Sequence, residues 1–243
     1  MNEELKKRKN EIRKMIWKEM WRKGISRFPP PFGRIPNFVG AEDAANLLRT
    51  LPEWKKAETI FCNPDSPQHP VRAYALIDGK TLIMATPRLK KGFLLLDSEK
   101  LQHINPWKAT TIRGAFQYGR ILDLLEIPEI DLKVCGSVAV DLEGRRIGKG
   151  HGYSEIEWGI LRELKRVSET TPVVTTVHDI QVLNEVPSEP HDVPVDIIVT
   201  CTRVIRVERK IEKPKGIFWE LVNEKMLEEI PILRVLKKMK QGL

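Results

Sequence analysis

The sequence has few cysteines and no long apolar run, and both absences limit the kind of protein it can be. It holds 3 cysteines in 243 residues, Cys62, Cys135 and Cys201, and no two of them form a Cys-x-x-Cys pair. This spacing argues against a disulfide framework and a zinc site, and it favours a reducing, cytoplasmic location. No apolar stretch approaches the roughly 20 residues that cross a bilayer. The charged N-terminus lacks the apolar core of a signal peptide, so we expect no membrane partner.

The composition is otherwise that of a globular protein. Aromatic residues make up 7%, apolar residues 41% and charged residues 30% of the chain. These fractions exclude collagen, a coiled coil and general disorder. A chain of this length buries one substantial core. We expect a single α/β domain over 1–243, with a basic N-terminal helix at 3–23 and a helical C-terminal tail at 217–240.

The positive charge is concentrated at the start of the chain. The formal net charge is +8, and residues 1–34 hold 11 Lys or Arg against 4 Asp or Glu. The rest of the chain is therefore close to neutral. A basic helix of this kind binds RNA, a membrane surface or the phosphates of a nucleotide, or it presents a solvated face. The sequence alone leaves these interpretations open.

Strand patterns alternate with helical patterns along the remaining chain. We expect strands at 58–62, 81–85, 94–96, 134–141, 173–177, 197–200 and 204–207. We expect helices at 41–50, 66–77, 114–125, 217–230 and 232–240, and another directly after residue 153. This alternation predicts a mostly parallel sheet with helices on both faces. Ligands of such sheets bind beyond the carboxyl ends of the strands, here the loops 63–72, 86–92, 142–155 and 178–192.

A glycine-rich loop precedes the helix that begins near residue 153. Gly148, Gly150 and Gly152 alternate with Lys149 and His151. Glycines spaced in this way allow backbone N–H groups to converge on an anion, and the following helix directs its N-terminal dipole at the loop. The neighbouring Arg145, Arg146 and Lys149 carry the charge that a phosphate needs. The loop is either a phosphate site or a plain flexible hairpin, and it matches neither the Walker nor the Rossmann pattern.

Two acidic segments carry the candidate metal ligands. Ser154-Glu-Ile-Glu157 fits a capping box, so we interpret Ser154 as a helix cap and not as a nucleophile. Glu155 then either complements the helix dipole or helps to hold Mg²⁺, which prefers one or two carboxylates plus phosphate oxygens. His191 and Asp192 lie in a proline-rich loop, where they brace the loop or where Asp192 supplies a second metal carboxylate.

Four segments, taken in order, resemble the 5-formyltetrahydrofolate cyclo-ligase (methenyltetrahydrofolate synthetase) family. The start is similar to the family's K-x-x-[IL]-R at Lys9-Asn-Glu-Ile-Arg13, and GKTLIMATP is similar to its GK-x-V-x-x-P segment. The core signature A-x-D-x-x-G-x-R-L-G-x-G-x-G-Y is similar to residues 139–153. The closing pattern is matched by Gln181, Pro187, Asp192, Val195, Asp196 and Thr200.

The resemblance implies a fold, a reaction and a set of site residues. The fold is a three-layer α/β sheet similar to sugar-phosphate isomerases and CoA transferases. In the reaction, ATP phosphorylates the formyl oxygen of 5-formyltetrahydrofolate, N10 attacks, and phosphate leaves to give 5,10-methenyltetrahydrofolate. ATP and its phosphates would meet Lys9, Arg13, Arg146, Ile147, Gly148, Lys149, Gly150, His151, Gly152 and Tyr153. Arg146 and Lys149 would be catalytic, and Glu155 and Asp192 would bind Mg²⁺.

The sequence departs from the family pattern at two places. After the glycines the family has Y-Y-D-R, whereas this chain has Tyr153-Ser-Glu-Ile. The family's folate-binding Glu-Thr pair has no counterpart in 63–72, so we assign substrate contacts to Asp65, Arg72 and Tyr153. The substrate is then a formylated folate or a related modified pterin. Two alternatives stay open, a non-catalytic member that binds a nucleotide or RNA, and an ATP-dependent ligase or kinase with another small acceptor.

Overall fold

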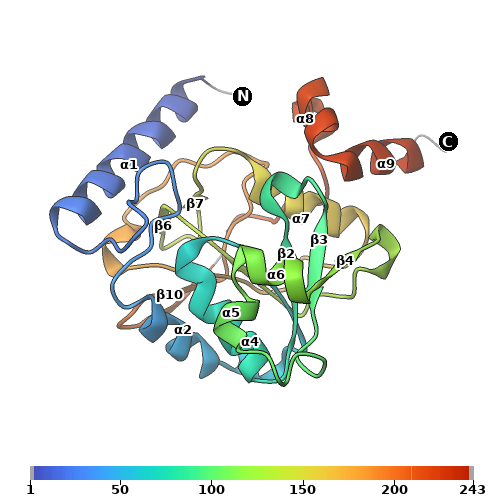
Figure 1. Cartoon of the computed structure of the whole chain (residues 1–243). Coiled ribbons are helices and arrows are strands. Elements are labelled where there is room, and N and C mark those ends of the chain that lie inside the picture. The colour runs from blue at the N-terminus through green and yellow to red at the C-terminus, as the bar shows by residue number, and fades with distance from the viewer. Residues whose placement is uncertain (1–2, 209, 241–243) are drawn as a thin grey trace.

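The structure is a computed structural model, and it describes residues 3–208 and 210–240. Its centre is a sheet surrounded by helices (Figure 1). This sheet has eight strands in the order β11-β10-β8-β5-β1-β2-β3-β4. These strands are β1 Thr59–Cys62, β2 Thr81–Ala85, β3 Phe93–Leu96, β4 Arg120–Leu122, β5 Leu132–Cys135, β8 Val173–Thr176, β10 Ile197–Val199 and β11 Val204–Arg206. A second, three-stranded sheet contains β6 Ala139–Asp141, β7 Arg146–Ile147 and β9 Val182–Leu183.

The central strands of the large sheet are parallel. β10, β8, β5, β1 and β2 pair in parallel, whereas β11, β3 and β4 add antiparallel strands at the two edges. The inner strands are short apolar runs, and every residue of β5 is buried. Such strands need cover on both faces, because neither set of side chains meets water.

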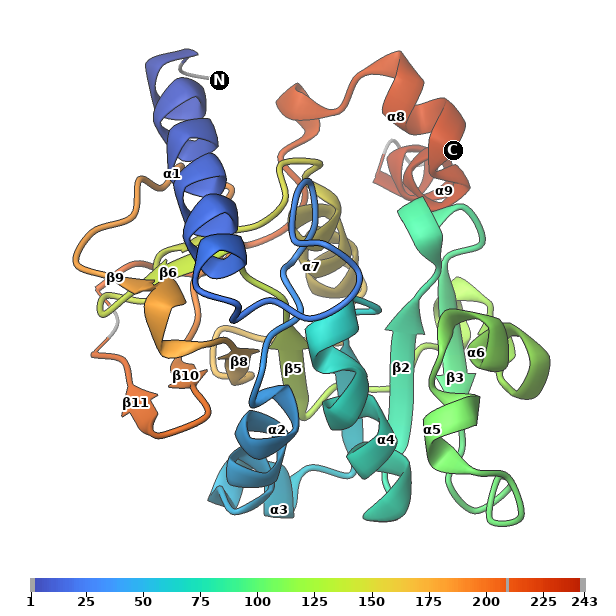
Figure 2. The same cartoon turned by 60° about the vertical axis from the view of Figure 1, so that its left-hand side comes forward.

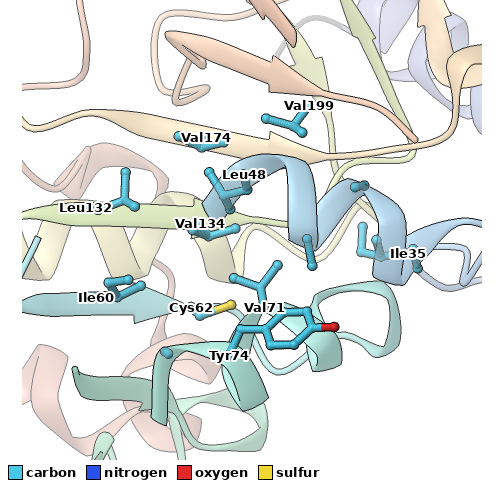
Figure 3. Packing of buried hydrophobic residues seen from close by; sticks show 14 of the residues in the cluster. Ile35, Leu48, Ile60, Cys62, Val71, Tyr74, Leu132, Val134, Val174 and Val199 are labelled. Carbon is cyan, nitrogen blue, oxygen red and sulfur yellow. The ribbon is translucent and has the colours of Figure 1, made fainter. Parts of the chain in front are cut away.

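Helices supply that cover, so the molecule has three layers. The α-helices are α1 Glu3–Arg22, α2 Ala41–Arg49, α3 Pro52–Lys56, α4 His69–Ile77, α5 Pro106–Ala109, α6 Ile112–Tyr118, α7 Tyr153–Glu163, α8 Glu224–Glu229 and α9 Pro231–Lys240. Side chains of α2 and α4 pack on one face of the sheet, with Leu48 and Val71 near Ile60 and Val134 (Figure 3). Side chains of α7, α8 and α9 join the cluster on the other face, which includes Phe61. The predicted α/β class with a mostly parallel sheet is confirmed.

The predicted strand over 134–141 is wrong, because that segment contributes to two sheets. β5 ends at Cys135 and β6 begins at Ala139. Gly136 lies at the break, where an added Cβ would come within 2.9 Å of Gln68 Oε1 and of Ile35 Cγ2. Glycine fits this position because a larger residue would have to displace one of these two side chains. The chain therefore leaves the large sheet beyond the carboxyl end of β5 and starts the small one.

Other predicted boundaries also change. The helix expected at 114–125 ends at Tyr118, and Arg120–Leu122 pairs with β3 as an edge strand. The helix expected at 66–77 begins as a 3-10 turn at Ser66–Gln68. The helix expected at 217–230 is a 3-10 turn at Trp219–Leu221 followed by the shorter α8, and Pro231 starts α9 instead of separating two helices.

Two expectations from the opening composition can be compared with the structure. All three cysteines are free, and burial raises the pKa of the Cys62 thiol to about 12. Among residues 3–208 and 210–240, no helix is both long and apolar enough to cross a membrane.

Candidate functional site

The glycine loop lies where α1, the small sheet and α7 meet. Residues 148–152 join β7 to α7, and α1 lies beside the small sheet (Figure 2). Arg13 on α1 donates from Nε to the carbonyl oxygen of Gly148 at 2.7 Å. Gly150 has a φ of 97°, and a Cβ there would lie 3.2 Å from Arg13 Cζ. The basic helix is therefore docked on the glycine loop through Arg13.

Arg146 is the most deeply buried cation of the site. Its Nε donates to the carbonyl oxygen of Val193 at 3.0 Å, and its Nη2 donates to Ser154 Oγ at 3.0 Å and Glu155 Oε1 at 2.5 Å. Burial acts to lower the pKa of Arg146, but the opposing charges, Glu155 first, hold that pKa above its ordinary value. The guanidinium is therefore permanently charged. It fixes the first turn of α7 to the segment that carries Val193.

The predicted helix cap at Ser154 is wrong. The N-cap of α7 is Gly152, in a left-handed conformation with a φ of 72°, and no side chain caps the helix. Ser154 lies inside the first turn and accepts a hydrogen bond from Arg146 instead. The glycine loop leads directly into this first turn. The first N–H groups of a helix have no partner within the helix, which favours an anion at this end.

Lys149 connects the glycine loop to the β1–α4 loop. Its Nζ lies 2.7 Å from Asp65 Oδ1. Arg72, another predicted substrate residue, is buried beneath the same loop. It donates to the backbone carbonyl oxygens of Asn63, Asp65 and Thr110 at 2.7, 2.9 and 3.1 Å. Asp65 and Lys149 therefore form a pair, whereas Arg72 is bonded to backbone carbonyls.

Lys9 lies between two carboxylates of the predicted acidic loop. Its Nζ is 2.5 Å from Asp192 Oδ2 and 3.0 Å from Glu189 Oε2. Glu189 was not among the predicted site residues. The acidic composition of 185–196 was the available signal, but composition does not indicate which carboxylate turns inward.

The two predicted metal carboxylates belong to one neighbourhood. Burial lowers the pKa of Arg13, and the charges of Asp192 and Glu155 both oppose that shift, so both carboxylates lie near this guanidinium. No three His, Cys, Asp or Glu side chains gather into a metal site in the part of the chain that the structure describes. Two carboxylates fit Mg²⁺ only when phosphate oxygens and water complete its six ligands. Glu155 and Asp192 alone therefore supply too few ligands for a metal ion.

Tyr153 and His151 form the edge of the site toward the C-terminal tail. Their ring centroids are 6.2 Å apart, and the Tyr153 hydroxyl donates to Glu229 Oε2 on α8 at 3.3 Å. Burial and the charge of Glu229 raise the pKa of Tyr153, and Arg88 opposes them. Arg88 belongs to the β2–β3 turn and has a φ of 56°. No sequence pattern indicates the contact between Tyr153 and Glu229, which are 76 positions apart.

Comparisons with known proteins show the family to which the chain is similar. Residues 3–201 match the 5-formyltetrahydrofolate cyclo-ligase family. The methenyltetrahydrofolate synthase domain-containing protein of Bos taurus is 41% identical over 241 residues, which cover 94% of this chain and 62% of that protein. The protein of the same name in Homo sapiens is 38% identical, with coverage of 96% and 62%. The chain thus spans about three-fifths of the length of these relatives.

A solved structure supports the fold. The 5,10-methenyltetrahydrofolate synthetase of Aquifex aeolicus is similar with a TM-score of 0.53 at 23% identity, covering 82% of this chain and 93% of that one. The sequence match extends over most of the chain, from α1 through the glycine loop to the acidic loop. The chain belongs to the 5-formyltetrahydrofolate cyclo-ligase family.

Proposed function

We propose that the chain is an ATP- and Mg²⁺-dependent cyclo-ligase that converts 5-formyltetrahydrofolate, or a related modified pterin, to its methenyl form in the cytoplasm. One observation carries the proposal. Four cations and two carboxylates from separate parts of the chain surround a glycine loop at a helix N-terminus, namely Lys9, Arg13, Arg146 and Lys149 with Glu155 and Asp192.

The arrangement suits the binding of a triphosphate. Lys9 and Lys149 are paired with Asp192 and Asp65, and Arg13 is paired with a backbone carbonyl. An incoming phosphate offers each of these cations a stronger partner. The N–H groups of the glycine loop and the dipole of α7 add to the attraction. Phosphoryl transfer needs mainly positioning and neutralisation of charge, and these groups supply both.

Mg²⁺ would be held by Glu155 and Asp192 together with ATP oxygens. It would supply charge neutralisation on the phosphates beyond that from Lys9 and Lys149. Lys9 must then leave Asp192 for the nucleotide, a short movement for a flexible side chain. Arg146 keeps Glu155 oriented from behind, because its other donors are already bonded to Val193 and Ser154.

The acceptor would lie on the side of Asp65 and Tyr153. Asp65 is the acidic group of the 63–72 loop closest to Lys149, and it is available to accept hydrogen bonds from a pterin once Lys149 turns to phosphate. Arg72 supports this arrangement from below by holding the carbonyls of Asn63 and Asp65. The formyl oxygen would attack the γ-phosphorus of ATP and displace ADP, N10 would then attack the formyl carbon, and phosphate would leave. Lys149 would neutralise charge on the transferred group.

The test is the formation of a methenyl product. The protein is mixed with 5-formyltetrahydrofolate, MgCl₂ and ATP, and the near-ultraviolet absorbance of the product is followed with and without ATP. We expect ATP-dependent product, and we expect Lys149→Ala and Asp192→Asn each to lower kcat/KM at least about 100-fold, the usual loss for a charge that stabilises the transition state.

Arg120→Ala is the matched control. Arg120 makes an ion pair of 2.5 Å with Glu126, equal in length to the Lys9–Asp192 pair, but it lies on the edge strand β4. Its removal should leave the rate unchanged. A protein that binds ATP but forms no product from any formylated folate would support the ligase or kinase with another acceptor. A protein that binds no ATP would contradict the proposal itself.

A further inference from the structure

A buried charged network lies between the large sheet and α7, beneath the candidate site. Lys133 of β5 is fully buried, and its Nζ is 3.2 Å from Glu157 Oε2 on α7. The same carboxylate oxygen accepts a hydrogen bond from Asn63 Nδ2 at 2.5 Å. Asn63 directly follows β1, so one carboxylate connects two neighbouring strands to the helix that starts at the glycine loop.

The network is a poor arrangement for stability. Burial raises the pKa of Glu157, and the charge of Lys133 opposes that rise. Contact of Lys133 with the ring of Phe61, at 3.9 Å from Nζ to the centroid, offsets only part of the cost of burying the ammonium group. Asn63 Oδ1 is buried and has no hydrogen-bond partner among the described residues. Buried ion pairs are often replaced by apolar side chains without loss of stability, so another role is indicated.

The contacts of Asn63 suggest what that role is. Its backbone oxygen accepts from Arg72, and its side chain is held by Glu157. Asn63 is thus fixed on both sides at the start of the loop that carries Asp65. Asp65 in turn holds Lys149 of the glycine loop at 2.7 Å. A continuous path of contacts leads from the buried pair to a cation of the site.

We propose that Glu157, supported by Lys133, is a positioning residue that fixes the β1–α4 loop against α7 and so aligns Asp65 with Lys149. The network touches no reacting atom. It acts through the position of Asn63. Its effect on catalysis rests on the proposed function, whereas its effect on the order of the loop does not.

The experiment exchanges both charged residues for methionine of similar length. In Lys133→Met/Glu157→Met we expect a melting temperature close to that of the wild type, because the loss of the buried ion pair is offset by the Asn63 amide left without Glu157. We expect amide hydrogen exchange at 63–68 to become roughly tenfold faster and the KM for ATP to rise roughly tenfold, because a misplaced cation binds phosphate poorly. Adding Lys149→Ala should then weaken ATP binding less than twofold further, since coupled positions are not additive.

Two further variants complete the experiment. One is a control for the loss of a buried lysine, and the other tests the link through Asn63 if the double variant does not fold. Lys213 is also buried, at 2% exposure, and its Nζ is 2.6 Å from Asp196 Oδ2 and donates to the carbonyl oxygens of Glu169 and Thr171. Lys213→Met should lower stability without changing exchange at 63–68. Asn63→Ala keeps the ion pair but removes the link, and it should accelerate the same exchange even if the double variant fails to fold.

The outcomes separate this inference from the proposed function. Unchanged exchange at 63–68 in a folded double variant and in Asn63→Ala would overturn the positioning role. Faster exchange in a protein whose wild type makes no methenyl product would leave the positioning role standing and would contradict only the cyclo-ligase activity. Multiplicative effects of Glu157 and Lys149 on ATP affinity would mean that the pair acts elsewhere.

Discussion

The cations of the site differ in how much of the fold depends on them. Arg146 is 2% exposed and bonds to Val193, Ser154 and Glu155, whereas the Lys149 side chain is 35% exposed and has one acidic partner. A buried cation with several acceptors leaves those acceptors unpaired when it is removed. An exposed lysine leaves its partner in water. Removal of Arg146 should therefore lower the stability of the fold as well as ligand binding, whereas removal of Lys149 should lower mainly ligand binding.

Arg146→Ala should lower the free energy of unfolding by about 3 kcal/mol, at the low end for buried pairs because Glu155 remains partly exposed. Lys149→Ala should lower it by less than about 1 kcal/mol. Urea unfolding followed by circular dichroism measures both values. Equal losses in the two variants would mean that the buried bonds of Arg146 contribute no more than a surface pair. Lys149→Ala is consequently the cleaner variant for nucleotide binding.

Secondary-structure elements with local signals were predictable from the sequence. The strand at 81–85 matches Thr81–Ala85, and the helix at 3–23 matches Glu3–Arg22, because each has an apolar pattern bounded by polar residues. The break of 134–141 was not predictable, since it depends on Gln68 and Ile35 approaching Gly136. Such contacts cross long stretches of chain and leave no periodic pattern.

In the candidate site too, local motifs were predictable from the sequence and long-range contacts were not. The glycine loop, Lys9, Arg13 and Asp192 were found from motifs, and the structure brings them together. Glu189 and the Lys133–Glu157 pair were missed, because only the fold shows which carboxylates turn inward. The RNA alternative for the basic helix stays a prediction. Two of its charges, on Lys9 and Arg13, already face the site, so RNA would have to use the others.

The β6–β7 hairpin depends on a glycine that contacts the acidic loop. Gly144 has a φ of 82°, its carbonyl oxygen accepts from Val195 N at 2.9 Å, and an added Cβ would lie 2.3 Å from the carbonyl oxygen of Val195. Gly144→Ala must therefore move two backbone segments apart. We expect it to lower the free energy of unfolding by about 3 kcal/mol, from left-handed strain plus overpacking.

Gly79→Ala is the matched control for that hairpin. Gly79 has a φ of 75°, and nothing lies within 4 Å of an added Cβ. Its substitution adds strain alone, about 1–2 kcal/mol. Thermal unfolding of both variants, with ATP affinity measured alongside, separates strain from contact. A Gly144→Ala protein as stable as Gly79→Ala would contradict the close approach of the hairpin to the loop that carries Asp192.

At the scale of the whole molecule, the site is assembled from distant parts of the chain. It lies beyond the carboxyl ends of the central strands of the large sheet. α1, the β1–α4 loop, the glycine loop and the acidic loop contribute one or two charged groups each. Figure 1 shows α1 on one side of this end of the molecule and the helices α8 and α9 on the other. No single element forms the site, so its charges are aligned only when the three layers are packed.

The packed state should therefore be sensitive to protonation of its partly buried histidines. Burial, and then the charge of Arg72, lower the pKa of His69, and burial also lowers the pKa of His178. Between these folded values and the ordinary value of about 6.5, the unfolded chain binds protons that the folded chain does not. The stabilising contribution is complete above pH 6.5 and is lost as the pH falls through the folded pKa.

Urea unfolding at pH 7, 6 and 5 should show falling stability, with a smaller fall in His69→Gln, whose amide can still donate to the carbonyl oxygen of Trp107. Equal slopes in the wild type and in His69→Gln would show that His69 carries none of the pH dependence.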